Sequence, residues 1–277
     1  MQLSLLEHAR LEIPTATDAE RVAILAQRMI DELDARPPID LEMVASWQGI
    51  EKVDIADIPW AGCLINDGGR ILMRLRRGDS RRRRRFTGFH EVGHTFCPGF
   101  RLEPQFRCNP PTPRQSPIEV LCDVVAGELL YPRRLVERDL AAADFGIETV
   151  VALAESYDGS FESAGHRFVS LWPEDTLLLV LEPGIRREEE GTHADPKLRV
   201  RSVHANGKWP YIPRNKSVEA AHPLGRALSG ELVDERGQLD GLCPSGPEVD
   251  ISARLIPYAR DGERVNRVLA LFRQPPN

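Results

Sequence analysis

The stretch His90-Glu91-Val92-Gly93-His94 places two histidines four residues apart, with a glutamate beside the first. On an α-helix, residues four apart lie on one face, about 6 Å apart along the axis, so both imidazoles can face one metal ion. Glu91 lies beside that face and can reach water at the metal without being a ligand, which is a general-base position. The alternative is a pair of surface histidines on a helix that also carries a glutamate. Apolar residues at helical spacing beside the histidines favour the metal site, because a partly buried imidazole pair needs partners.

Zinc held by two histidines needs a third protein ligand and leaves the fourth position for water or substrate. Glu119 is the candidate ligand, because it follows His94 on the next predicted helix. Asp123 lies one turn further along the same face, where its carboxylate can accept the outer N–H of a ligating histidine and fix the tautomer. Salt bridging is the structural alternative for both carboxylates. The ligand set favours Zn²⁺, although Mn²⁺ or Fe²⁺ also suit two imidazoles and a carboxylate.

Composition excludes several classes of protein. The chain has 277 residues, of which 42% are hydrophobic and 28% charged, as in ordinary soluble globular proteins. No apolar run is long enough to cross a bilayer, so no membrane association is predicted. The amino-terminal segment lacks the features of a secretory signal, which predicts a cytoplasmic protein. A net charge of −6 argues against broad nucleic-acid affinity but does not bear on local basic patches.

The five cysteines are scattered and form no C-x-x-C pair, which predicts reduced thiols. Cys97 and Cys108 follow the histidine motif, so a thiolate ligand is one alternative for them, and a buried free cysteine is the other.

Periodicity and capping signals predict the elements around the motif. A capping box at Thr17 opens a helix to about residue 34, and a second short helix runs from 40 to 47. A small antiparallel sheet is predicted from the strands 50–55, 60–65 and 70–75. The motif helix begins near Ser80, the proline-rich stretch 97–116 is irregular, and a further helix covers 117–130.

Five consecutive arginines, Arg81–Arg85, open the motif helix. Adjacent positions point all around a helix, so they form no single binding stripe, and a solvated first turn is one interpretation. Arginine near a helix N-terminus opposes the helix dipole, which indicates acidic partners elsewhere in the fold or on a substrate.

The last part of the chain follows a different pattern. Strands are predicted over 176–181 and 197–203, a loop over 186–195, and a short helix near 217–228. A terminal hairpin joins 247–259 to 264–273 through Asp261-Gly262. These elements predict a separate α+β unit from about residue 174.

The run RRRRRFTGFHEVGHTF, followed by IEVLCDVVAGELLYP, resembles the ImmA/IrrE family of bacterial metallopeptidases in the order and spacing of both halves. The resemblance implies a gluzincin-like zinc peptidase with His90, His94 and Glu119 as ligands, Glu91 as general base and Asp123 as the supporting acceptor. The sequence departs from the family pattern at Tyr131, where methionine is usual, and at Asp123, where asparagine is commoner. Neither position is a predicted metal ligand.

The segment LAESYDGSFESAGHRF, from Leu153 to Phe168, resembles a further family segment and has the outline of a helix-turn-helix. Packing against the catalytic helices is favoured for it over direct DNA binding, because its second helix offers Glu162, His166 and Arg167 and not a basic face. Arg167, or His166 beside it, can instead reach the cleft as a catalytic residue that stabilises the oxyanion of peptide attack.

We therefore expect an α+β protein in three parts. A mainly helical, zincin-like metallopeptidase domain with a small antiparallel sheet covers 1–132, a helix-turn-helix-like segment covers 133–173, and an α+β domain covers 174–277. Some family members carry a GAF-like sensor domain in this last place, and a rigid accessory domain without a ligand is the alternative.

The expected reaction is peptide hydrolysis by metal-activated water with Glu91 as general base. The resemblance implies a narrow protein substrate, a helix-turn-helix repressor of the XRE type, whose cleavage derepresses stress or mobile-element genes. The alternative is a regulator that binds DNA or the repressor and whose metal site is structural or inactive.

Overall fold

The computed structural model describes residues 3–100, 105–107, 116–185, 195–239, 241–243, 246–260 and 263–275. Within these ranges the chain is α+β, as predicted, but strands are too extensive to confirm a mainly helical arrangement. It divides into two compact units: unit 1 comprises Met1–Val136 with Ala154–Ser160, and unit 2 comprises Glu137–Leu153 with Phe161–Asn277. The predicted division at residues 132 and 173 stays a prediction about folding domains.

Side-chain caps begin the helices of unit 1. Ser4 and Thr17 each accept a hydrogen bond from the amide of a glutamate three residues on, and that glutamate bonds back to the cap, so both form capping boxes. Asp40, Ser80 and Ser116 cap later helices by accepting one hydrogen bond from the backbone amide three residues on. The capped helices are α1 (Leu5–Glu12), α2 (Asp18–Glu32), α3 (Leu41–Trp47), α4 (Arg81–His94) and α5 (Pro117–Leu130).

A small sheet in unit 1 has the order β1-β3-β2-β4 within the described residues. Its strands are β1 (Ile50–Ala56), β2 (Gly62–Asp67), β3 (Arg70–Arg76) and β4 (Gln105–Arg107). The prediction of an antiparallel sheet is wrong for β1, which pairs with β3 in parallel, whereas β2 pairs with β3 and β4 in antiparallel fashion. The tight turn at 68–69 fixes only the β2–β3 hairpin, and β1 joins it through a longer connection that permits either direction.

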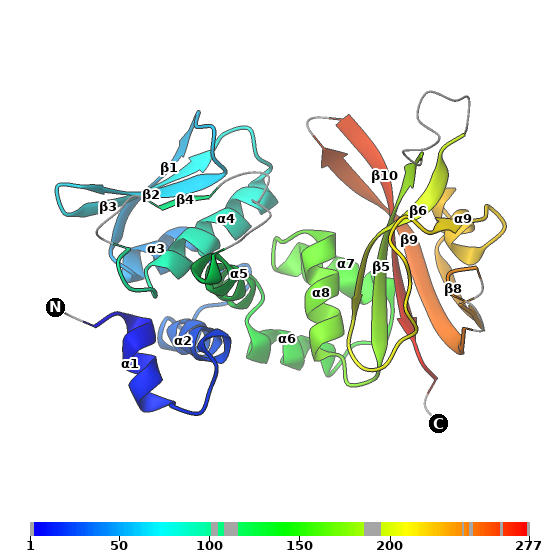
Figure 1. Ribbon diagram of the computed structural model, residues 1–277, viewed down its shortest axis with the longest axis horizontal. Helices are drawn as coiled ribbons and strands as arrows, with labels where there is room; N and C mark the ends of the chain where they lie inside the picture. Colours follow the sequence, from blue (N-terminus) through cyan, green and yellow to red (C-terminus); the bar gives the residue numbers. More distant parts are fainter. Residues whose placement is uncertain are drawn as a thin grey trace. The chain divides into compact units, whose positions relative to one another are not determined.

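The closest helix contact in unit 1 joins α4 to α5 (Figure 1), and α4 also packs against α3, β2 and β3. Glycine makes the α4–α5 contact possible. A Cβ at Gly93 would lie 2.8 Å from the Cys122 Cα, closer than real Cβ contacts come. The absence of a side chain at Gly93 therefore sets how near the two helices lie.

The arginines at the start of α4 have acidic partners inside unit 1, as the helix dipole argument predicted. The Asp158 carboxylate lies 3.0 Å from a nitrogen of Arg81, 3.3 Å from Arg85 and 3.9 Å from Arg82. Asp158 has a φ of 51°, which places it in the left-handed turn after α7 (Ile147–Ser156). Burial lowers the pKa of Arg85, although Asp158 opposes this effect. The ion pairs thus attach the turn at 157–160 to α4.

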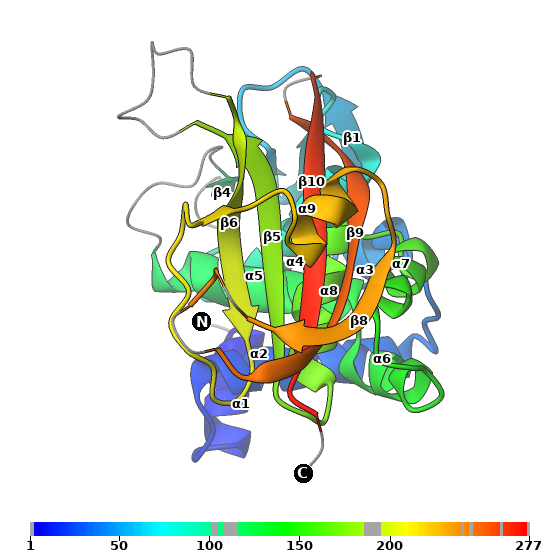
Figure 2. The same ribbon diagram turned by 90° about the vertical axis from the view of Figure 1, so that its right-hand side faces the viewer.

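Unit 2 is built on an antiparallel sheet with the order β7-β6-β5-β10-β9-β8 in the described part of the chain. Figure 2 shows α9 on one face of this sheet and α8 on the other. The elements are α8 (Phe161–Leu171), β5 (Thr176–Gly184), β6 (Lys197–Ala205), β7 (Ser217–Val218), α9 (Pro223–Leu228), β8 (Val233–Gln238), β9 (Glu248–Arg260) and β10 (Glu263–Arg273). Helix α6 (Arg133–Leu140), like α7, contributes residues to both units.

Strand β5 is buried on both faces, which explains its continuous apolar run. Leu177, Leu179 and Leu181 face the core cluster beneath α9, together with Leu224 of that helix. Leu178 faces the other way, where a Cβ at Gly165 of α8 would lie 2.8 Å from it. The predicted loop 186–195 and the turn of the terminal hairpin at 261–262 lie almost wholly outside the described residues.

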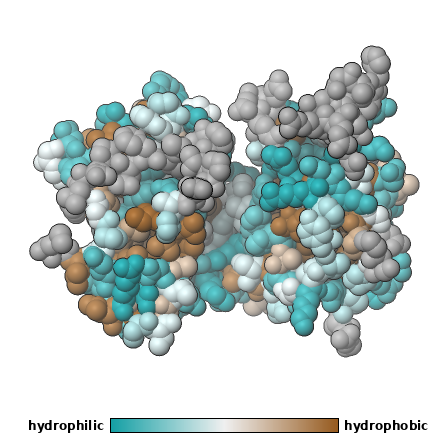
Figure 3. All heavy atoms as spheres, in the orientation of Figure 1, coloured by the Kyte–Doolittle hydropathy of each residue, from teal (hydrophilic) through white to brown (hydrophobic). Residues whose placement is uncertain are grey.

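Among the described residues, no helix combines the length and apolar character that crossing a membrane requires. On the face drawn in Figure 3, hydrophilic residues cover most of the coloured surface, and hydrophobic residues occur in small groups.

Replacing Gly93 with alanine should destabilise unit 1 by about 1–3 kcal/mol, because the added methyl group overpacks the α4–α5 contact. The matched control is Gly127→Ala on α5, where no described atom outside the surrounding backbone of the same helix lies within 4 Å of the new Cβ. That control should raise stability by about 0.5–1 kcal/mol, because alanine loses less backbone entropy in a helix. Thermal unfolding of both variants checks this, and equal effects of the two substitutions would contradict the close-packing argument.

Candidate metal centre

Helix α4 presents both histidines of the motif on one buried face. His90 is 0% exposed and His94 is 1% exposed, and their ring centroids lie 5.2 Å apart. One helical turn separates the two residues, so the spacing follows directly from the helix geometry. Imidazoles buried to this degree need polar partners to offset their lost hydration.

Helix α5 supplies those partners from two carboxylates one turn apart. Glu119 approaches both imidazoles: one carboxylate oxygen lies 3.1 Å from His90 Nε2, and the other lies 3.5 Å from His94 Nε2. Asp123 lies 2.8 Å from the opposite ring nitrogen of His90, Nδ1. The structure therefore brings together the four residues that the sequence nominated as metal ligands and supporting acceptor.

Two of the ligand separations that a zinc ion requires are present at this cluster. Bonds of 2.0–2.1 Å from zinc at tetrahedral angles place neighbouring ligand atoms about 3.3 Å apart. The two separations between Glu119 and the imidazole Nε2 atoms, 3.1 and 3.5 Å, lie on either side of that value. The donor set of two imidazoles and one carboxylate is also one that catalytic zinc sites use.

Asp123 fixes which nitrogen of His90 is available to a metal. When the Nδ1–H group donates a hydrogen bond to the Asp123 carboxylate, Nε2 carries the lone pair and faces Glu119. A carboxylate in this position also raises the basicity of the imidazole and holds the ring in one orientation. The pairing agrees with the supporting role predicted for Asp123.

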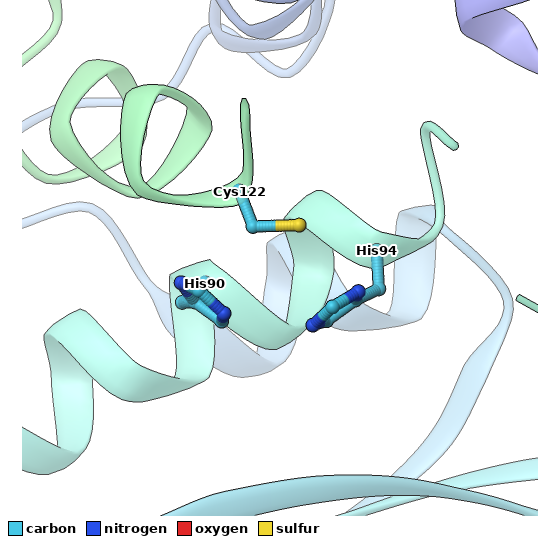
Figure 4. Close-up of side chains that lie close together, drawn as sticks. All are labelled: His90, His94 and Cys122. Atoms are coloured by element: carbon cyan, nitrogen blue, oxygen red, sulfur yellow. The ribbon is translucent and has the colours of Figure 1, made fainter. Parts of the chain in front are cut away.

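Cys122 is a second neighbour of the histidines that sequence reasoning did not consider as a ligand. Its sulfur and one nitrogen of each of the two histidines lie within 4.8 Å of one another, and all three residues are buried. Figure 4 shows Cys122 on α5, facing the histidines on α4. The available signal was its position between Glu119 and Asp123 on the same helix.

The thiol of Cys122 is poorly suited to release its proton. A hydrogen bond with Cys97, burial and the nearby carboxylates of Glu119 and Glu91 raise the pKa of the Cys122 thiol. A thiol must be deprotonated to bind a metal, so Cys122 could serve as the third donor only by losing this proton, and Glu119 and Cys122 are both candidates beside the histidines. Cys97 is itself buried and is not part of the histidine cluster, while Cys108 lies outside the described residues.

Glu91 is fully buried on α4, against strand β2 of the small sheet. Its carboxylate lies against Gly62 of β2, where an added Cβ would be 2.9 Å from Oε1. The side chain also lies near enough to raise the pKa of the Cys63 thiol, after the larger effect of burial. Backbone packing at Gly62 thus gives this carboxylate a defined position in unit 1.

His166 and Arg167, the candidates for oxyanion stabilisation, belong to unit 2. His166 stacks on His204 of β6, with ring centroids 4.4 Å apart and an interplanar angle of 15°. Burial lowers the pKa of His166, which favours the neutral imidazole in this stack. These contacts give His166 a packing role within unit 2, and a catalytic role for either residue stays a prediction.

Neither known family models nor curated proteins match this sequence. Among solved structures, a Mycobacterium tuberculosis transcriptional regulator is similar, with a TM-score of 0.56 and 13% sequence identity. The similarity covers 98% of this chain and 81% of that chain. At this identity the likeness concerns the fold alone.

Metal analysis of single variants should separate the two possible third donors. We expect Glu119→Ala to lose zinc binding and Cys122→Ala to keep it, because the Glu119 carboxylate approaches the Nε2 atoms of both histidines at 3.1 and 3.5 Å. Asp123→Asn should weaken zinc binding by about 10–100-fold through the lost support of His90. Competition with a chromogenic chelator measures all three affinities, and zinc loss from Cys122→Ala alone would show that the thiol is the ligand.

The buried histidine stack should make unit 2 less stable in acid. His166 has a lowered pKa when folded, so the unfolded chain binds a proton first as the pH falls below about 6.5. The stabilisation is therefore present above that pH and is lost as the pH falls further. His166→Phe should make the dependence of unfolding on pH shallower between about pH 7 and 5, whereas His8→Phe, at an exposed position of α1, serves as the control. An unchanged slope in the His166 variant would contradict this account.

Proposed function

We propose that the chain is a metal-dependent endopeptidase with a regulatory role. The observation that supports this most is the approach of one carboxylate, Glu119, to the Nε2 atoms of both buried histidines at 3.1 and 3.5 Å. A buried glutamate, Glu91, lies on the same helix beside this cluster. Together these groups form the donor set and the general base that hydrolytic zinc sites require.

In this proposal His90, His94 and Glu119 hold the metal, and Asp123 orients His90. When bound, zinc supplies Lewis acidity that polarises a peptide carbonyl and makes water a stronger acid at neutral pH. Manganese or iron(II) are alternatives for the same ligands. Tetrahedral zinc has four coordination positions. Because the protein fills three of them with two imidazoles and a carboxylate, the fourth is left to water or substrate.

Glu91 acts as the general base in the proposed reaction. Its carboxylate takes a proton from the attacking water as the new carbon–oxygen bond forms at the scissile carbonyl. The same proton passes to the departing amine nitrogen as the carbon–nitrogen bond breaks, which leaves a carboxylic acid and an amine. Burial against Gly62 holds the carboxylate in one position and keeps bulk water from competing for it.

The proposed substrate is a cytoplasmic helix-turn-helix repressor of the XRE type, as the resemblance to the ImmA/IrrE family implies. The name of the structural neighbour, a transcriptional regulator, agrees with a role in gene control. We also propose that unit 1 is a gluzincin-like domain and that the six-stranded sheet of unit 2 belongs to a GAF-like domain. The same neighbour also favours a second candidate function, in which the chain binds DNA or a repressor without cutting it and the metal site is structural.

Glu91→Gln should lower peptide hydrolysis by about 10²–10⁴-fold while zinc binding stays at the wild-type level, because the side chain is a proton acceptor and not a ligand. The substrate for the assay is a repressor encoded beside this gene, followed by gel electrophoresis and mass spectrometry. Glu42→Gln, at an exposed position of α3, is the matched control and should remain active.

The assay also separates the two candidate functions. If the repressor stays intact after incubation with the zinc-loaded wild type, the peptidase proposal is wrong. Binding of the intact repressor or of duplex DNA, equal in wild type and Glu91→Gln, would then support the second candidate function.

A further inference from the structure

The segment 196–218 of unit 2 is basic in an acidic chain. It contains six lysines and arginines and no acidic residue, whereas the whole chain has 42 acidic against 36 basic residues. Two aromatic residues, Trp209 and Tyr211, lie within it. Cations interleaved with aromatic side chains are typical of surfaces that bind the phosphates and bases of nucleic acids.

This segment forms β6 and the connection that follows it, at one side of the sheet. Figure 2 shows β6 beside β5, with the other long strands beyond β5. Only the two-residue β7 pairs with β6 on its outer side, at Leu198 and Arg199, among the described strands. The outer edge of residues 202–205 therefore has no neighbouring strand in the described part of the chain, and exposed edges of this kind are available for binding.

Hydrogen bonds anchor the connection at both ends. Near its start, the Lys208 amide donates to Asp175 at 3.0 Å, and Gln274 donates to the Lys208 carbonyl at 3.0 Å. At its end, the Asn215 amide donates to the Val200 carbonyl at 2.8 Å. The residues between these anchors are thus held near the edge of β6 without pairing to it.

A cavity of about 500 Å³ lies at this place, lined by residues of the connection, of β6 and of the start of β5. Trp209 and Tyr211 contribute its aromatic surface, and Arg214 contributes a cation. Tyr211 is 83% exposed, which is unusual for a large side chain with no partner to cover it. The buried indole N–H of Trp209 has no acceptor among the described residues, so a donor is also available there.

Three exposed cations near this cavity form no ion pair with the described acidic side chains, although the Asp175 carboxylate lies against Gly207 of its lining. Lys197 is paired with Glu219 at 3.8 Å, and the buried Arg199 donates to backbone carbonyls. Arg201, Lys208 and Arg214 are exposed, and no acidic side chain in the described residues forms an ion pair with them. The surface therefore offers positive charge to an anion, at little desolvation cost and with a long-range attraction that depends on salt.

We propose that this cavity, defined by Trp209, Tyr211 and Arg214, binds a nucleotide, either free or within a single-stranded nucleic acid. The base stacks on the exposed Tyr211 ring, and the phosphate contacts Arg214 with Arg201 and Lys208 nearby. Positive charge decides against a neutral apolar ligand, and the exposed ring decides against a simple inorganic anion. Duplex DNA fits less well, because its bases are already stacked on one another.

Fluorescence anisotropy of a labelled oligothymidylate with the 277-residue protein tests this site. Tyr211→Ala should weaken binding by about 5–150-fold, the usual effect of losing one base–aromatic stack. Arg214→Glu should weaken binding and reduce its dependence on salt, because one phosphate contact is lost. The controls are Trp47→Ala, an aromatic residue 53% exposed in unit 1, and Arg36→Glu, whose side chain is 82% exposed. Both controls should bind as the wild type does.

Competition identifies the source of the nucleotide. Displacement of the labelled strand by thymidine monophosphate, at concentrations similar to those of an unlabelled strand, supports a free nucleotide as ligand. Displacement only by the strand supports single-stranded nucleic acid. The proposal is overturned if neither probe binds at low salt, or if a duplex of equal length binds as tightly as the strand. It is also overturned if Tyr211→Ala binds as the wild type does while circular dichroism shows that the variant is folded. None of these readouts depends on the metal site, so the peptidase proposal stands or falls separately.

Discussion

The contact between α4 and α5 is the packing on which the candidate metal centre depends. Gly93 lets the α5 backbone at Cys122 approach α4 more closely than any side chain would allow. Because Glu119 and Asp123 lie one turn apart on α5, the same approach carries both carboxylates to the two ring nitrogens of His90. Buried polar groups are stable only when they are paired, so the helix contact and the polar cluster stabilise each other.

The arginine run shows a related dependence on distant residues. By itself, a helix that begins with five arginines is poorly matched to its dipole. The left-handed turn at Asp158 provides a carboxylate to three of these arginines, although a long stretch of sequence separates them. The ion pairs reduce the charge repulsion at the start of α4 and hold the turn that follows α7. The arginine run is in this way partly paired within the fold, although 73% of the Arg81 side chain stays exposed.

In unit 2, by contrast, three exposed basic residues near β6 have no ion-pair partner among the described residues. The core strand β5 is buried on both faces by residues such as Leu177 and Leu178, which fixes the sheet between α8 and α9. Strand β6 completes it on one side, where β7 pairs with only two of its residues. The connection between them is held near the edge of β6 by hydrogen bonds to Val200, and it lines the cavity at Tyr211. The basic residues of the segment 196–218 and the cavity beside β6 therefore lie in the same part of unit 2.

Local signals in the sequence determined the helices α2 to α5, because capping residues and apolar periodicity act within a few residues. They also nominated His90, His94, Glu119 and Asp123, since each pair lies one turn apart on its own helix. Only the tertiary structure decided that β1 pairs in parallel with β3 and that Cys122 lies beside the histidines. It also decided that Asp158 forms ion pairs with the arginines at the start of α4. It also assigned His166 to the second unit, where it stacks on His204. These outcomes depend on which elements pack together, and packing between distant elements is set by shape, burial and charge across the whole fold.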